Sequence, residues 1–369
     1  MKRRNLLKSA AGIMFCGCGL KHAAEAATAT RDQAPAHHKL PVIVGGKRVR
    51  SIDVHAHCFF PAAFMALDGK IDSHIPKTKG AHDFLLTAED AQAMARRMAQ
   101  MDAMGIDTEV LSVNPFWYGT PRELSQKIVR INNEAMAALT HAHPDRFAGF
   151  CSLSLQFPDL AVQELEDAIK VKGLKGAAIG AHVAGLDFAD PKFDPVWAKA
   201  EALDAALFIH PASTPQLNKR FQGNGWLSNV IGNPLDTSIA LEHLIFQGTL
   251  DKFPKLKVIA AHGGGYLPSY AERMDYGCYV SPANCDPAIR LKKQPTEYLR
   301  QMYYDVLVFS PEALRHLIAE VGVSQLMLGT DHPIPWNEHP IDRMFEGHLL
   351  NDRQRRAIIH ENAARVLRI

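Results

Sequence analysis

The sequence has almost no excess charge of either sign, because 41 Lys and Arg residues stand against 39 Asp and Glu. A net charge of +2 offers no electrostatic footprint for nucleic acid or for an anionic membrane, so neither is expected as a partner. Its 25 glycines follow no three-residue period, which excludes collagen. At 47% hydrophobic residues the chain is too apolar for a disordered protein, and its length suits one large domain.

Residues 1–29 also lack a long hydrophobic run, since the apolar stretch 9–20 is too short for a permanent membrane span. The segment KRRNLLKSAAG resembles a twin-arginine export signal, and AEA at 24–26 or ATA at 27–29 offers a cleavage site. We therefore expect export to the periplasm through the twin-arginine machinery. Residues 30–41 then form a flexible spacer, and 42–369 form one domain. The alternatives are a frayed amphipathic helix and a lipoprotein lipidated at Cys18.

Cysteine is scarce, with six residues, of which two would leave with the signal. The remaining four are Cys58, Cys151, Cys278 and Cys285, and none has CxxC spacing. Four cysteines in a domain of this size are no disulfide scaffold. Cys278 and Cys285 could pair in an oxidising compartment, but the pattern favours four free, mostly buried thiols.

From residue 42 the chain alternates short apolar runs with helical periodicity. A β-hairpin is predicted around Gly45 and Gly46, with its second run ending at His57. Strands are expected at 52–57, 108–113, 147–153, 174–182, 206–211, 256–262, 302–306 and 325–331. Helices are expected at 88–104 (with Thr87 as N-cap), 122–142, 159–172, 193–204, 236–249, 266–277 and 311–321, then near 340–349 and 352–368.

Eight strands that alternate with helices predict an α/β fold, a (β/α)₈ TIM barrel with a short N-terminal hairpin and extra C-terminal helices. A doubly wound open sheet is the alternative, weakened because no GxGxxG follows the first strand. The long connections 58–87 and 212–235 are expected to shape a mouth or lid.

Histidine is abundant, with 18 residues, and several stand where predicted strands end. His55 and His57 are two apart on one strand and so face the same side. His210 ends LFIH, His262 ends KVIAAH and Asp331 ends LMLGTD. The carboxyl ends of barrel strands meet at one mouth, so these side chains are expected to gather there.

Three imidazoles and a carboxylate form a complete ligand set for Zn²⁺ or a similar divalent ion, with room for a water or substrate oxygen. The alternative is that several of these residues cap strand ends by bonding to loops. His182, just past the fourth strand, is a further candidate to line the mouth and bind substrate.

The motifs DVHAH, HP after the fifth strand, AHGGG and GTDHP resemble those of the amidohydrolase superfamily. Within it, the chain from about residue 50 to 368 resembles the branch of aminocarboxymuconate-semialdehyde decarboxylase. The segments that carry this likeness, in order and spacing, are GIDTEVLSV, HPDRFAGFCSL, DKFPKLKVIAAHGGGYLP and LMLGTDHPIP. The resemblance implies that His55, His57, His210 and Asp331 bind one divalent ion and that His262 is the catalytic histidine. The ligand types favour zinc as that ion, with manganese as the alternative.

A single ion also agrees with the fourth strand. Dinuclear relatives carry a carboxylated lysine at the end of this strand, which bridges the two ions. Here the strand reads GAAIGAH, and Lys172 and Lys175 fall at its beginning. The missing bridge argues against a second ion.

The same resemblance implies two substrate-binding residues, and the chain departs from the family at a third position. Arg273 matches an arginine that reaches a neighbouring subunit's site and holds a substrate carboxylate, which implies a homodimer. The alternative is an exposed helix arginine. Trp226 falls near a tryptophan of the pocket wall, or it is a packing residue. The family's second carboxylate-binding arginine is missing from KTKGAHDFLLTAED, where Lys77 or Lys79 is the only possible substitute.

The expected activity is therefore metal-dependent, nonoxidative decarboxylation of an aromatic or unsaturated carboxylic acid, with His262 and Asp331 as general acid and base. The alternative is metal-dependent hydrolysis of a lactone, an amide or a related ring, because the family's hydrolases use nearly the same ligands. A remote alternative is a metal-binding protein without catalysis.

Overall fold

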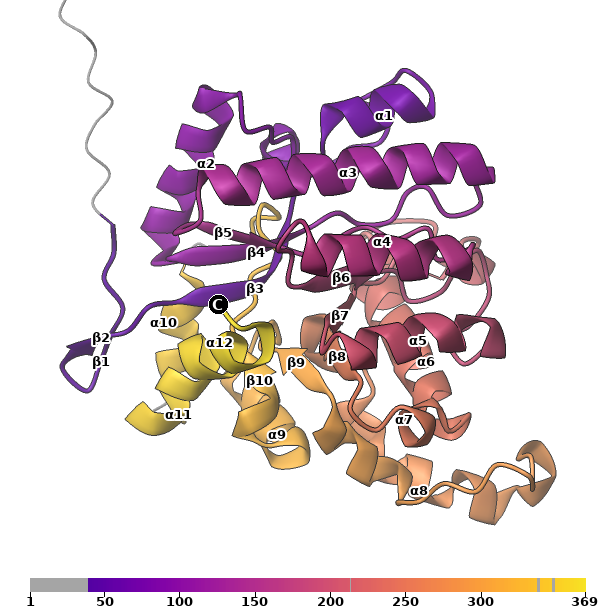
Figure 1. Cartoon of the computed structure of the whole chain (residues 1–369). Helices are drawn as coiled ribbons and strands as arrows, with labels where there is room; N and C mark the ends of the chain where they lie inside the picture. The colour runs from indigo at the N-terminus through magenta and orange to yellow at the C-terminus, as the bar shows by residue number, and fades with distance from the viewer. Residues whose placement is uncertain (1–38, 213, 337–338, 347–348) are drawn as a thin grey trace, which may run out of the picture. The chain divides into compact units, whose positions relative to one another are not determined.

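A computed structural model describes residues 39–369 except 213, 337, 338, 347 and 348 (Figure 1). The expected export signal and nearly all of the spacer lie outside the described residues. Within the described part of the chain, no helix combines the length and apolar character needed to cross a membrane.

The N-terminal hairpin is shorter than predicted. Strand β1 (Ile43–Val44) pairs antiparallel with β2 (Lys47–Arg48). The turn between them is made by Gly45 and Gly46 at positive φ of 58° and 73°, a backbone region that glycine enters without strain. The second run ends at Arg48, and a separate strand, β3 (Ile52–His57), carries the histidines into the core. Arg48, the last residue of β2, bonds Asp107 with both terminal guanidinium nitrogens and so ties the hairpin to the barrel.

Eight parallel strands form the barrel, as predicted. They are β3, β4 (Thr108–Ser112), β5 (Phe147–Gly149), β6 (Gly176–Ile179), β7 (Ala206–Ile209), β8 (Lys257–Ala260), β9 (Tyr303–Asp305) and β10 (Leu326–Met327). They run in the orders β3-β4-β5 and β6-β7-β8-β9-β10.

Backbone contacts at two seams close these two runs of strands into a barrel. A parallel bridge between Cys151 and Ala177 joins the β5 side to β6. At the other seam Ala56 bridges His332, and the Val54 amide donates to the Leu328 carbonyl at 2.9 Å. The open-sheet alternative is therefore wrong.

Helices lie outside the strands (Figure 1). They are α1 (Pro61–Leu67), α2 (Ala91–Met104), α3 (Arg122–Ala142), α4 (Pro158–Lys170), α5 (Asp194–Ala202), α6 (Asn233–Phe246), α7 (Thr249–Lys252), α8 (Ala271–Val280), α9 (Pro311–Val321), α10 (Pro340–Phe345), α11 (Asp352–Arg356) and α12 (Asn362–Leu367).

Several helix boundaries differ from the sequence prediction; helix α8, for example, begins at Ala271 where 266 was predicted. Three of the differences have a clear local cause. Helix α2 begins after Asp90, whose carboxylate accepts from the amides of Gln92 and Ala93, whereas Thr87 only accepts from the Asp90 amide. The predicted helix 236–249 is divided by Gly248, at φ 73°, into α6 and α7. The C-terminal helix is interrupted between α11 and α12 by a wider π-helical turn, Ala357–Glu361.

The barrel interior is apolar and is closed at the end opposite the mouth. Strand residues such as Val110, Phe208 and Met327 pack with Val366 and Leu367 of α12. Lys257, which begins β8, donates its ammonium to the Val366 carbonyl, so α12 lies at the amino ends of the strands. This arrangement leaves the carboxyl ends free for chemistry.

One expectation about the cysteines is wrong. Cys278 and Cys285 form a disulfide that ties the end of α8 to the turn that follows it. Their Cα atoms lie 5.7 Å apart because Ser281 and the Pro282–Asn284 turn bring the chain back on itself. Cys58 and Cys151 are buried free thiols, as expected.

Candidate metal centre and active site

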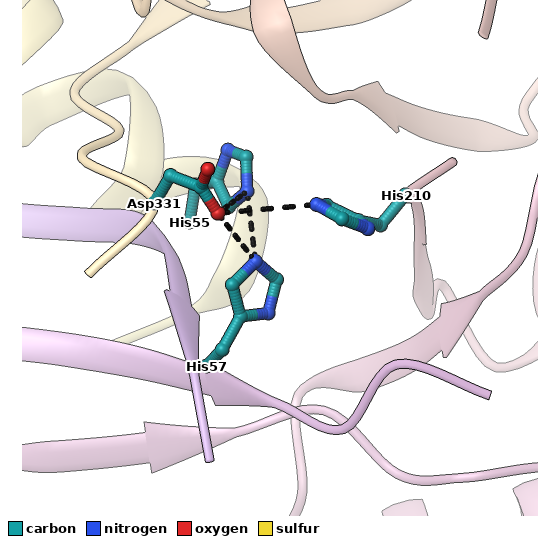
Figure 2. Close-up of side chains that lie close together, drawn as sticks. All are labelled: His55, His57, His210 and Asp331. Carbon is teal, nitrogen blue, oxygen red and sulfur yellow. Dashed lines mark hydrogen bonds and ion pairs between the residues drawn. The ribbon is translucent and has the colours of Figure 1, made fainter. Parts of the chain in front are cut away.

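Four metal-ligating side chains meet at the carboxyl ends of the strands (Figure 2). His55 and His57 come from β3, His210 follows β7, and Asp331 lies in the loop after β10. Their ligand atoms all lie within 4.8 Å of one another, and all four residues are buried. The described part of the chain holds no second cluster of three or more such groups.

The three imidazoles converge on one carboxylate oxygen. The Oδ1 atom of Asp331 lies 2.8 Å from His57 Nε2 and 3.1 Å from His55 Nε2. His210 Nε2 lies 3.9 Å from the same oxygen. The side chains therefore surround one point with three nitrogens and one oxygen, as the sequence predicted.

Hydrogen bonds on the far side of each β3 imidazole set its tautomer. His55 Nδ1 donates to Asp305 Oδ2 at 2.6 Å, which leaves the Nε2 lone pair facing the cluster. Ser112 donates its hydroxyl to the Ala56 carbonyl, so its oxygen accepts from His57 Nδ1 at 2.9 Å. Both Nε2 atoms are thereby ready to bind a cation.

The unpartnered ring of His210 shows most clearly that these residues fit a metal ion. Both of its ring nitrogens are buried and have no hydrogen-bond partner, which is costly for a polar side chain. Burial holds the pKa of His210 well below its usual range, so the ring is neutral and its lone pair is open. A divalent ion at the cluster would satisfy the Nε2 atom, which faces Asp331, and the set of three neutral imidazoles and one carboxylate suits such an ion.

The electrostatics of the other ligands agree with this assignment. Burial alone would raise the pKa of Asp331, but the neighbouring histidines hold that pKa well below its usual range and keep the carboxylate ionised. Burial lowers the pKa of His57 to about 4. Burial also opposes the charged form of His55, but the carboxylates of Asp331 and Asp305 outweigh it and raise its pKa to about 10. A metal ion at the cluster would replace the proton that this raised pKa retains on His55.

His262 stands beside this cluster but is not one of the four ligands. It follows β8, and its Nε2 lies 3.7 Å from Asp331 Oδ2, the oxygen turned away from the histidine cluster. His262 and Asp331 both have positive φ, at 55° and 64°, a conformation that costs energy for residues other than glycine. Such strain is concentrated at functional sites.

The glycines after His262 allow the close packing that places it. Gly263, Gly264 and Gly265 all have positive φ. A Cβ atom on Gly265 would lie 2.1 Å from the Pro234 carbonyl oxygen, so any side chain there would push the His262 loop away from α6.

Two residues that the sequence analysis did not select complete the site. Asp305 ends β9 and accepts from His55 and from the backbone amides of His262 and Gly263, so it holds both parts of the site. It is the only charged residue of the run MYYDV and stands next to its end, close to where the other site residues stand in theirs, and that signal could have revealed it. Trp336 donates its indole N–H to Asp331 Oδ2 at 2.6 Å, and no periodicity marks it.

Buried acidic and basic side chains behind the metal ligands anchor the segments that carry those ligands. Asp53 Oδ1 accepts from the amides of His55 and Thr330, which joins β3 to the loop after β10. Glu109 lies between Arg97, at 2.7 Å, and His332 Nδ1, at 2.6 Å. These contacts hold the residues on either side of Asp331 against the barrel wall.

A cavity of about 340 Å³ opens from His262 and Trp336, a volume in the range of small-molecule sites. Its other lining residues are mostly apolar and come from the 229–234 and 263–269 segments, the loop after β9, and α9. They are Asn229, Val230, Asn233, Pro234, Gly263, Gly265, Tyr266, Pro268, Ser269, Leu307, Val308, Phe309, Ala313, His316 and Leu317.

The three substrate-binding candidates occupy different positions. Trp226 stacks on Trp336, a lining residue of the cavity, with ring centroids 5.8 Å apart. His182 points its Nε2 toward Asp236 Oδ1 at 3.9 Å, and this nitrogen is buried without a hydrogen bond. Arg273 is exposed on α8 and does not line the cavity of its own chain.

The model of the amidohydrolase family matches residues 52–369. The chain belongs to this family. It is 32% identical over 290 residues to the 2-amino-3-carboxymuconate-6-semialdehyde decarboxylase of Dictyostelium discoideum. That match covers 78% of this chain and 76% of the relative. The branch predicted from the motifs is therefore confirmed.

Two solved structures of the family share the fold. The 5-carboxyvanillate decarboxylase of Sphingomonas paucimobilis has 27% sequence identity and a TM-score of 0.74, and the match covers 87% of this chain and 99% of that one. A dihydroxybenzoic acid decarboxylase of Polaromonas sp., with bound manganese and the inhibitor 2-nitroresorcinol, has 25% identity and a TM-score of 0.73. That match covers 87% of this amidohydrolase and 97% of the Polaromonas chain.

Proposed function

We propose that this amidohydrolase is a metal-dependent, nonoxidative decarboxylase of aromatic or unsaturated carboxylic acids. The observation that carries the proposal is the position of His262. Its Nε2 lies 3.7 Å from Asp331 Oδ2, next to the four-ligand cluster, and His262 also lines a mostly apolar cavity. The site thus combines a place for a cation, two proton-transfer groups and room for a ring. The relatives named above are decarboxylases, which supports the same reaction here.

A divalent ion held by His55, His57, His210 and Asp331 would act as a Lewis acid that polarises a substrate oxygen. The protein must deliver one proton to the ring carbon that bears the carboxylate. His262 donates this proton as a general acid, and the ionised Asp331 carboxylate beside it is the general base that takes up the replacement proton. The bond to the carboxylate then breaks, its electron pair restores the aromatic ring, and CO₂ leaves. Solvent returns the proton to the protein.

Trp336 and Asp305 prepare the two groups for this transfer. The Trp336 indole N–H holds Asp331 Oδ2, the oxygen that faces His262. Asp305 accepts from the His262 amide and so fixes the strained backbone of that residue. Both are positioning residues, since each acts through a neighbour.

Zinc is the proposed native ion, because neutral imidazoles make up three of the four ligands and suit zinc well. Manganese is the alternative, supported by the ion bound to the Polaromonas relative. Elemental analysis of protein purified without added metal distinguishes the two.

The substrate carboxylate is proposed to be held by Arg273 of a second chain, with His182 and Trp226 at the mouth. Large exposed apolar residues support such a homodimer, because they gather in and beside α8 and around the cavity rim. They include Tyr270, Tyr276, Tyr279 and Val280 near α8, and Trp226, Val230, Ile231 and Phe309 at the rim. An arginine among them offers a bidentate grip on a carboxylate.

Export to the periplasm by the twin-arginine machinery is the proposed route. Its support is the disulfide between Cys278 and Cys285, because such bonds persist in oxidising compartments. The double variant Arg3→Lys with Arg4→Lys should keep the precursor in the cytoplasm, with its metal bound. Normal export of that variant on cell fractionation would reject the twin-arginine route.

Product analysis tests the reaction. The metal-loaded protein is incubated in D₂O with a panel of hydroxybenzoates and, separately, with lactones and amides. Decarboxylation predicts CO₂ and an arene that carries deuterium at the vacated carbon. Ring opening without CO₂ would favour the hydrolase alternative. A metal-binding protein without catalysis would convert neither panel.

A further inference from the structure

Three aromatic rings meet beside the Asp331 carboxylate, and each comes from a different loop at the mouth. Trp226 belongs to the chain between β7 and α6, Phe309 follows β9, and Trp336 follows β10. The Trp336 ring stacks on Trp226 with centroids 5.8 Å apart and an interplanar angle of 18°. Phe309 meets the same ring edge-on, with centroids 5.6 Å apart. Trp336 therefore packs against rings from two separate loops.

Both outer rings stand on strained backbone and face solvent. Trp226 has φ of 53° and Phe309 has φ of 52°, the left-handed region that bulky side chains rarely adopt. Their exposed fractions are 45% and 51%, so the burial of apolar surface compensates only partly for this strain. Backbone strain of this kind is concentrated at functional sites. Packing alone therefore does not account for the position of these two rings.

The ring that both of them contact acts on the metal centre through its indole N–H. Trp336 donates to Asp331 Oδ2 at 2.6 Å, whereas the three histidine ligands surround Oδ1. The indole bond thus fixes the carboxylate so that Oδ1 stays in the ligand cluster and Oδ2 stays 3.7 Å from His262 Nε2. A tilt of the indole would loosen this arrangement, because hydrogen bonds weaken steeply away from linear geometry.

The segment that carries Trp226 depends on backbone conformations that glycine adopts freely. Gly223 and Gly225 have φ of 108° and 100°. A Cβ atom on Gly225 would meet only Leu227 Cδ2, at 3.7 Å, which is an ordinary contact. The glycine is therefore required at this position by the backbone and not by lack of space. It sets the direction in which the chain enters Trp226.

From these contacts we infer that Trp226 is a positioning residue for proton transfer, which acts on Asp331 through Trp336. The segment 223–226 thereby holds the general base in place, so proton transfer depends on the position of this segment. The inference rests on the proposed decarboxylation. It goes further by giving Trp226 a role that requires no contact with the substrate.

A double-mutant cycle tests this route. Trp336→Phe keeps a ring for stacking and removes the indole N–H. Trp226→Ala should lower kcat roughly tenfold, within the range of coupling between contacting residues, and leave KM nearly unchanged. In the Trp336→Phe background the same change should lower kcat by less than roughly twofold. A further loss of the first size in that background, or a loss confined to KM, would overturn the inference and make Trp226 a substrate contact.

Matched variants separate the stacked ring from general damage to the segment. Trp226→Phe retains a stacking ring and should keep kcat close to the wild-type value, as should Asn224→Ala, an exposed neighbour. Gly225→Ala retains every ring but disfavours φ of 100°, so it should lower kcat as Trp226→Ala does. Its control is Gly69→Ala, at φ 75° with open space around it. Equal losses of kcat in Trp226→Ala and Asn224→Ala would overturn the role of the ring.

The indole resonance of Trp336 tests the contact without turnover. The chain has four tryptophans, so selective ¹⁵N labelling gives four indole signals, and Trp336→Phe identifies the one bonded to Asp331. In the metal-loaded protein, Trp226→Ala should shift this signal toward that of a solvent-exposed indole, whereas Asn224→Ala should not. This shift without CO₂ release from any acid would support the route from Trp226 to Asp331 and reject the proposed reaction. An unchanged signal would overturn the inference, whatever the turnover.

Discussion

His55 and His57 present their Nε2 lone pairs to the same point because Asp305 and Ser112 occupy the opposite ring nitrogens. His210 has no such partner on either nitrogen. The cluster is therefore assembled from two oriented imidazoles, one unsatisfied imidazole and a carboxylate held by Trp336. Three of the four ligands therefore depend on a neighbour that orients them.

Replacing His55 or His57 by Ala should abolish stoichiometric binding of one divalent ion per chain, because one ligand of four is lost. Elemental analysis of the purified variants measures this. His243→Ala is the matched control, because His243 lies on α6 and bonds only Asp187 among the ionisable groups around it. Two ions in the wild-type chain, or undiminished metal in both variants, would contradict the one-ion site.

His262→Ala should retain most of the metal but lower kcat by roughly 10²-fold or more, the usual contribution of a general acid or base. The reason is that His262 contacts the outer oxygen of Asp331 and stands apart from the ligand cluster. Parallel measurements of metal content and kcat decide the role. Loss of metal in proportion to activity would make His262 a ligand.

At the scale of elements, the N-terminal hairpin is fastened to the barrel through one carboxylate. Asp107 accepts from Arg48 at 2.6 and 3.0 Å, from the Ser51 amide at 2.8 Å, and pairs with Lys39 at 2.5 Å. Burial alone would raise the pKa of Asp107, but the hydrogen bonds from Arg48 and Lys39 hold the pKa well below its usual range.

Asp107→Asn should reduce the free energy of unfolding at pH 7 by about 1–3 kcal/mol, the usual cost of losing charge-assisted hydrogen bonds. The pKa of Asp107 is lower in the folded than in the unfolded chain. Its stabilising contribution is therefore complete above the unfolded pKa of about 4 and is lost as the pH falls through the folded value. The difference in free energy of unfolding between wild type and variant should therefore become smaller below about pH 4.

Denaturant unfolding at neutral and acidic pH measures that gap. The exposed Asp145→Asn serves as the control. A gap that stays constant with pH would show that the Asp107 carboxylate charge does not fasten the hairpin.

Much of this element order could be predicted from the sequence, because buried parallel strands and amphipathic helices leave clear periodic patterns. Helices α3 and α9 begin and end where the periodicity placed them. Boundaries set by single side chains were missed, as at Asp90, where a carboxylate cap decides the start of α2. The metal ligands were predicted because they lie at or just past the carboxyl ends of apolar runs.

Other site residues were missed because their roles depend on tertiary contacts. Trp336 reaches Asp331 from a loop without any pattern, and Ser112 acts through a single hydroxyl. The disulfide between Cys278 and Cys285 depends on a turn that spacing alone does not specify. Such contacts follow from how the elements pack, which local sequence does not encode.

For the whole molecule, the barrel gathers the ligands, but its own cavity offers no arginine to hold a carboxylate. Arg273→Ala should therefore raise KM strongly and leave metal content unchanged, if a second chain supplies this group. Mixing it in equal amounts with His262→Ala should restore about a quarter of the wild-type sites, because each mixed dimer regains one composite site. Arg290→Ala, another exposed arginine, is the control.

Light scattering and steady-state kinetics on the mixed sample measure this outcome. A monomeric protein would contradict the shared site. So would a failure to restore activity when subunit exchange has been demonstrated.

The most direct test of the whole account is a metal titration of CO₂ release. The apoprotein is loaded stepwise with zinc or manganese, and CO₂ formed from a hydroxybenzoate is measured at each ratio of ion to chain. The account predicts no release from the apoprotein, a linear rise and a plateau at one ion per chain. Full CO₂ release without metal, or a plateau at two ions per chain, would contradict it.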